Sequence, residues 1–114
     1  TPVKYRNDKI KSAFKEIEEE AAQELLERLP EDLRGEYAPY LQESEWTPEE
    51  YKLVKAADKL SALIKCIEEQ KAGNQEFQKA KEASEAYLRD MNCPEADIFC
   101  QEFLPHYYKT LDEL

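Results

Sequence analysis

The feature that most constrains the fold is a stretch of regularly spaced apolar residues between two helix-boundary signals. These apolar residues, which recur at intervals of three and four, are Leu53, Ala57, Leu60, Ile64 and Ile67. Such spacing puts them on one side of an α-helix. Before them, Thr47 can cap the helix, Pro48 suits its first position and Glu50 completes a capping box. Gly73 can supply a left-handed ending. The sequence therefore predicts a helix over 48–72 with one buried side.

The rest of the chain shows the same helical periodicity, and no useful stretch alternates as a strand would. Further helices are expected over 7–29 and 31–42, from Asn74 to a break at Cys93-Pro94, and in a last segment that Pro105 kinks or splits. Their expected inward residues include Ile10, Phe14, Ile17, Ala21, Leu25, Leu33, Tyr37, Tyr40, Leu41, Phe77, Ala80, Ala83, Tyr87, Leu88 and Met91. No repeat or linker interrupts the pattern. We predict an all-α fold of about five helices in a single domain spanning residues 1–114.

The charge balance narrows the range of partners. The net charge is −10, from 26 acidic and 16 basic residues, so the surface repels phosphodiester backbones and disfavours a nucleic-acid polymer. No apolar run approaches the length of a membrane span.

The three cysteines, Cys66, Cys93 and Cys100, form no Cys-x-x-Cys pair. We expect reduced thiols in a cytoplasmic protein, with Cys66 as a core residue.

Asp58 is the most informative polar residue, because it lies one position from the expected apolar side. A charge at the edge of a core needs a counter-ion, a hydrogen-bond donor or a metal. An ion pair with Lys55, Lys59 or a neighbouring helix is one reading, and a metal site is the other. The single histidine, His106, has no partners for a catalytic set, and no glycine-rich phosphate loop is present. The residues alone therefore identify no catalytic group.

Several segments, taken in order and spacing, carry a family resemblance. They are Thr1-Pro2-Val3-Lys4-Tyr5, Leu29-Pro30-Glu31-Asp32-Leu33-Arg34, Leu53-Val54-Lys55-Ala56-Ala57-Asp58-Lys59-Leu60, Leu63-Ile64-Lys65-Cys66-Ile67-Glu68-Glu69, Ala72-Gly73-Asn74-Gln75-Glu76-Phe77, Phe103-Leu104-Pro105 and Leu111-Asp112-Glu113. Together they resemble the C-terminal half or more of the bacterial HD-domain 5′-deoxynucleotidases, the YfbR-like group. The resemblance implies the C-terminal part of an HD-domain helical fold.

The resemblance also implies a metal-dependent phosphohydrolase that releases the 5′-phosphate of deoxyribonucleoside 5′-monophosphates. Asp58 matches a metal-ligating aspartate of that family that could also touch the substrate. Thr1 matches the end of a substrate-contacting loop. The implied cofactor is a divalent metal ion of the cobalt, manganese, magnesium or zinc class, and the implied assembly is a homodimer. A divalent cation would let so acidic a protein hold a phosphate monoester and activate water.

The chain departs from the family pattern in one respect: it has no His-Asp dipeptide and only one histidine. We therefore expect a fragment that neither binds the metal tightly nor hydrolyses nucleotides alone, and that self-associates through exposed apolar surface. Two alternatives remain open. One is another HD-superfamily phosphohydrolase, acting on nucleoside triphosphates or signalling nucleotides. The other is a non-catalytic helical interaction domain in which Asp58 forms a structural ion pair.

Overall fold

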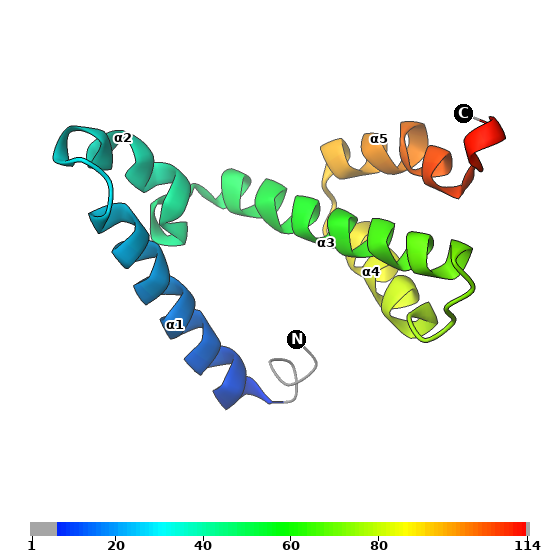
Figure 1. Cartoon of the computed structure of the whole chain (residues 1–114), viewed down its shortest axis with the longest axis horizontal. Helices are drawn as coiled ribbons and strands as arrows, with labels where there is room; N and C mark the ends of the chain where they lie inside the picture. Colours follow the sequence, from blue (N-terminus) through cyan, green and yellow to red (C-terminus); the bar gives the residue numbers. More distant parts are fainter. Residues whose placement is uncertain (1–6, 114) are drawn as a thin grey trace. The chain divides into compact units, whose positions relative to one another are not determined.

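A computed structural model describes residues 7–113 of the chain, and every regular element in that range is helical (Figure 1). The α-helices are α1 (Asp8–Glu27), α2 (Glu31–Leu41), α3 (Pro48–Lys71), α4 (Gln78–Asp90) and α5 (Pro94–Glu102). Three short 3₁₀ helices follow α2 and α5: η1 (Glu43–Glu45), η2 (Leu104–Tyr108) and η3 (Leu111–Glu113). The predicted all-α class with about five helices is confirmed.

The chain divides at the Thr47–Pro48 junction into two compact units. The first contains α1, α2 and η1, and the second contains α3, α4, α5, η2 and η3. That the two units form one domain stays a prediction. Within the described residues, no helix combines the length and the apolar character needed to cross a bilayer.

In the first unit, α1 begins where the sequence predicts, since the Asn7 side chain accepts a hydrogen bond of 2.9 Å from the backbone N–H of Ile10. Such a cap satisfies one of the free N–H groups of a helix start. At the other end, the Arg34 guanidinium donates to the carbonyl oxygens of Glu27 and Leu29, at 2.8 and 2.9 Å. Arg34 therefore ties α2 to the C-terminal end of α1.

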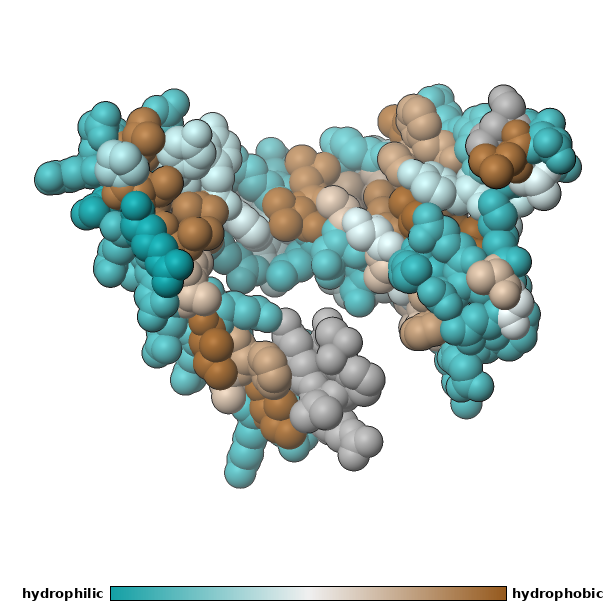
Figure 2. All heavy atoms as spheres, viewed as in Figure 1, coloured by the Kyte–Doolittle hydropathy of each residue, from teal (hydrophilic) through white to brown (hydrophobic). Residues whose placement is uncertain are grey.

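The apolar side of α1 is exposed, contrary to the prediction that it faces inward. Leu26 is the one buried residue of the helix, whereas Phe14, Ile17 and Leu25 are 39%, 58% and 51% exposed. Figure 2 shows brown apolar residues in a row along α1. The pattern is amphipathic as predicted, but the contact of α2 with α1 leaves these three apolar residues exposed.

The second unit has a conventional core built on α3. Its buried residues are Ala56, Leu60, Leu63 and Ile67 of α3, Leu88 of α4, Cys93 before α5 and Ala96 of α5. Met91, Phe99, Cys100, Leu104 and Tyr107 pack against this cluster. Because α4, α5 and η2 all contact α3, the long helix is the element that organises the unit.

The buried side of α3 is rotated about the helix axis relative to the side that the sequence predicted. Leu53 is 43% exposed and Ala57 is also exposed, whereas Ala56 and Leu63 are 3% and 1% exposed. The prediction for α4 contains a similar error, because Tyr87 was expected to face inward and is 44% exposed. The ammonium group of Lys59 lies 5.1 Å from the centre of the Tyr87 ring, which gives this aromatic residue a contact outside the core.

Two predicted boundaries also differ. The α4 helix begins at Gln78 rather than at Asn74, because the Asn74 side chain forms a turn of its own: its oxygen accepts from the Glu76 backbone N–H at 3.1 Å, and its amide donates to Glu69 at 2.8 Å. The last helical segment is split into α5 and η2, with Pro105 at the start of η2. The sequence predicted that Pro105 would kink or split this segment. Gly73 has the predicted left-handed backbone, with φ at 88°.

Candidate functional site

Asp58 lies in the third turn of α3, on the side that faces away from the core of its unit. It is two residues from both Ala56 and Leu60, which are buried. Two residues correspond to roughly 200° of rotation around an α-helix. The Asp58 side chain therefore projects from the side of α3 opposite Ala56 and Leu60. Asp58 is exposed, and the prediction that it borders the core is wrong. The prediction is wrong because the buried side of α3 is rotated, so that Ala56 is buried and Ala57 is exposed.

Several exposed residues on the same side of α3 as Asp58 are small or apolar, and Lys55 lies among them. Tyr51, Val54, Ser61 and Ala62 lie at spacings of three, four and seven from Asp58 and share its side of the helix. Tyr51 and Val54 are 43% and 42% exposed, and Ser61 and Ala62 are exposed as well. We call these five residues the Asp58 face. It presents one carboxylate beside small and apolar side chains, with Lys55 over the Tyr51 ring.

The lysines that flank Asp58 do not neutralise it in the described part of the chain. The Lys59 ammonium lies over Tyr87, and the Lys55 ammonium lies 5.0 Å from the centre of the Tyr51 ring. Within residues 7–113, the Asp58 carboxylate makes no hydrogen bond and no ion pair. The ion pair offered by the structural reading of Asp58 is therefore not formed among these residues, and its oxygens are available to a ligand.

An exposed carboxylate on a rigid helix suits a divalent cation as one ligand, since hard cations take carboxylate oxygens. A metal site needs several such groups, and across residues 7–113 no three His, Cys, Asp or Glu side chains are close enough to hold one ion. These residues therefore do not form a complete metal site. Asp58 can supply one ligand and no more.

The other candidates from the sequence add nothing to the Asp58 face. Thr1 lies outside the described residues. His106 is exposed in η2, next to Pro105. Cys66 and Cys93 are buried free thiols, which confirms Cys66 as a core residue. Burial raises the pKa of the Cys100 thiol, and the charges of Asp97 and Glu85 raise it further, so this cysteine is a poor nucleophile.

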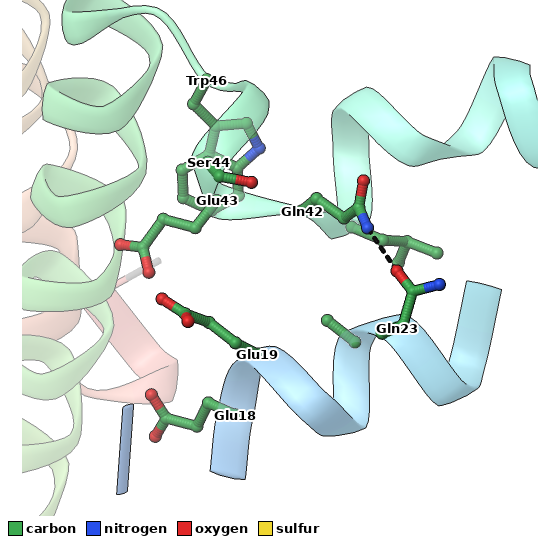
Figure 3. A pocket seen from close by; sticks show the side chains of 9 residues that line it. Glu18, Glu19, Gln23, Gln42, Glu43, Ser44 and Trp46 are labelled. Atoms are coloured by element: carbon green, nitrogen blue, oxygen red, sulfur yellow. Dashed lines mark hydrogen bonds between the residues drawn. The ribbon is translucent and has the colours of Figure 1, made fainter. Parts of the chain in front are cut away.

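A separate pocket of about 300 Å³ lies in the first unit, between α1 and the η1 segment. Its lining includes the carboxylates of Glu18, Glu19 and Glu43. Figure 3 shows the Glu19 and Glu43 carboxylates turned toward one another, and the Gln42 amide donating to Gln23 at 2.6 Å. Because carboxylates in proximity repel one another, this pocket is an acidic surface without an assigned ligand.

Fold and site together define a small all-α protein that presents one available carboxylate on a long helix rather than a finished catalytic centre. Residues 1–107 match the model of the YfbR-like 5′-deoxynucleotidase family. The chain therefore belongs to the YfbR-like family, as the resemblance in the sequence predicted.

Named relatives support the same assignment. The chain is 45% identical over all of its 114 residues to the proteins called 5′-deoxynucleotidase YfbR of Escherichia coli strain ATCC 8739 and of Shigella boydii serotype 18. In each case the matched region covers 57% of the relative. The chain thus spans little more than half the length of these curated relatives.

Proposed function

We propose that the protein carrying this chain is a 5′-deoxynucleotidase, which hydrolyses deoxyribonucleoside 5′-monophosphates to the nucleoside and phosphate. In this reaction water forms a new bond to phosphorus, the bond from phosphorus to the 5′-oxygen breaks, and that oxygen receives a proton. The observation that carries the proposal is the match of the whole chain, at 45% identity, to proteins named 5′-deoxynucleotidase.

Within this function, Asp58 acts as one ligand of a divalent metal ion of the cobalt, manganese, magnesium or zinc class, and its free oxygen can contact the substrate. Its exposure and its lack of a partner within residues 7–113 support this role. Thr1 is the second proposed substrate contact, on the family resemblance alone. The small side chains of Ser61 and Ala62 beside Asp58 leave space for a ligand close to the helix.

The chain of 114 residues by itself is proposed to be inactive. Its single histidine and the lack of a three-ligand group among residues 7–113 support this, because a tight metal site requires several converging ligands. Stoichiometric metal bound by the purified chain at micromolar free metal would contradict it.

Two properties of the intact protein complete the proposal. We propose a homodimer, which the many exposed apolar residues support, among them Ile17, Tyr40 and Phe103 at 58%, 73% and 52% exposure. We also propose a cytoplasmic location. The unpaired state of Cys66, Cys93 and Cys100 supports it, since free thiols persist in a reducing compartment.

The test is a substrate panel on the protein expressed from its native reading frame. Phosphate release is measured with a deoxyribonucleoside monophosphate, its ribonucleoside counterpart and the matching deoxyribonucleoside triphosphate, with and without a chelator. The proposal predicts chelator-sensitive release from the deoxy monophosphate in preference to the other two. Preference for the triphosphate would favour the other HD-superfamily reading, and absence of any release would favour a helical interaction domain.

A further inference from the structure

A second pocket, of about 280 Å³, lies within the second unit and is separate from the Asp58 face. Its apolar lining consists of Leu63 of α3, Leu88 of α4 and Leu104 at the start of η2. Leu63 and Leu88 are 1% and 4% exposed, so core residues form the base of the pocket. The pocket is smaller than the usual site for a drug-sized ligand, which restricts it to a small molecule.

The charged residues of this pocket are of both signs, and we call Glu85 and Asp97 its negative pole and Arg89 its positive pole. Glu85 and Asp97 line it from α4 and α5, and Arg89 lines it one helical turn after Glu85. Although Glu85 and Arg89 have the spacing of a helical ion pair, Arg89 makes no ion pair and no hydrogen bond within residues 7–113. The guanidinium therefore keeps all its donors available.

The negative pole is also visible at the wall of the pocket. Cys100 lines it, and the charges of Asp97 and Glu85 add to burial in raising the pKa of its thiol. Two carboxylates and one guanidinium thus line the same pocket, the carboxylates on α4 and α5 and the guanidinium on α4.

We propose that this pocket binds a free α-amino acid with a branched aliphatic or aromatic side chain. The ammonium group would lie against Glu85 and Asp97, the carboxylate would accept hydrogen bonds from Arg89, and the side chain would cover Leu63, Leu88 and Leu104. Residues one turn apart on a helix, such as Glu85 and Arg89, have Cβ atoms about 5–6 Å apart. The Glu85 carboxylate and the Arg89 guanidinium could then contact the ammonium and the carboxylate of one amino acid. A ligand with one charge would leave one pole unused.

The experiment is an NMR titration of the isotopically labelled chain, which needs neither metal nor nucleotide nor turnover. The three probes are L-phenylalanine, phenethylamine, which lacks the carboxylate, and hydrocinnamate, which lacks the ammonium. For a ligand of this size we expect a Kd of about 1 mM for L-phenylalanine. Amide shifts should move in α4 and α5, and both single-charge probes should bind at least about tenfold more weakly.

Two variants and one control test the assignment of the poles. Arg89→Gln should weaken L-phenylalanine at least about tenfold and leave phenethylamine unchanged, because only the carboxylate contact is lost. Asp97→Asn should weaken phenethylamine as well. Lys79→Gln, which removes a positive charge from the exposed surface of the same helix, should change neither.

Equal binding of the three probes, or an equal effect of Arg89→Gln and Lys79→Gln, would overturn the proposal. So would an absence of shifts in α4 and α5 at about ten times the expected Kd, provided that the spectrum shows a folded second unit. Because no reaction is measured, none of these results bears on the proposed nucleotidase function.

Discussion

The helices α1 and α3 are similar in length and periodicity, yet they are used very differently. The α1 helix has 20 residues and buries one of them, Leu26. The α3 helix has 24 residues and buries five, including Leu63 and Ile67 at 1% and 0% exposure. The two helices differ in their neighbours, because α4, α5 and η2 pack on α3, whereas the main helical contact of α1 is with α2. Periodicity shows which side of a helix can be buried, and only packing shows whether it is.

The two sides of α3 repeat this contrast at a smaller scale. One side holds the core of the second unit, and the other presents the Asp58 face. Replacements on the first side should change the stability of the fold, whereas replacements on the second should change binding and leave stability nearly unaffected.

The largest effect on stability is expected at Leu63. Leu63→Ala should lower the free energy of unfolding by about 3 kcal/mol, because it leaves a cavity in a closely packed core. The matched change Leu25→Ala, on the exposed side of α1, should cost less than about 0.5 kcal/mol. Urea denaturation followed by circular dichroism measures both. Equal costs would show that the exposed side of α1 is buried in solution.

Self-association of the chain is expected to depend on α1. Ile17→Glu places a charge in the exposed apolar row and should weaken self-association at least about tenfold, since a charge desolvated at an interface is costly. The control Glu20→Gln, on the same helix, should have little effect. Sedimentation velocity measures the two variants. A parent chain that remains monomeric at every concentration would contradict the expectation.

Asp58→Asn should change the stability of the chain by less than about 0.5 kcal/mol, because an exposed carboxylate without a partner in residues 7–113 contributes little to folding. Thermal unfolding of the variant and the parent measures the difference. A loss of several kcal/mol would instead indicate the buried ion pair of the interaction-domain reading.

The smallest effect concerns the end of α3. The Lys65 ammonium lies 3.0 Å from Glu69, and hydrogen bonds from Lys65 and then Asn74 lower the pKa of the Glu69 carboxyl. Its contribution to stability is therefore complete above the unfolded-state pKa of about 4.3, and it is lost as the pH falls through the lower pKa of the folded state. Glu69→Gln should remove this part of the acid dependence, as measured by unfolding between neutral and acidic pH. A variant that keeps the full dependence would rule out Glu69 as its source.

The sequence predicted the helical elements well because their boundary signals are local. Pro48 begins α3 and Gly73 follows its end, as their backbone preferences require. The start of α4 was wrong because the Asn74 side chain satisfies the Glu76 backbone N–H in a turn before the helix begins. A side chain that competes with the helix in this way leaves no trace in hydrophobic periodicity.

The site was predicted less completely than the fold. Asp58 stays a predicted site residue. Its position opposite the core was not predicted, because Ala56 and Ala57 are both small and apolar and either can face inward. The pocket beside Arg89 was missed for a different reason. It joins residues of α3, α4, α5 and η2, and the sequence does not specify how these four elements meet.

The most direct test of the central proposal is the activity of Asp58→Asn in the protein expressed from its native reading frame. Phosphate release from deoxyadenosine monophosphate should fall by at least about 100-fold, as expected when a metal ligand loses its charge, with an unchanged melting temperature. Asp90→Asn, a matched change at the exposed end of α4, should retain the parent activity. Activity of Asp58→Asn close to that of the parent, or an equal loss in Asp90→Asn, would contradict a metal-ligating role for Asp58.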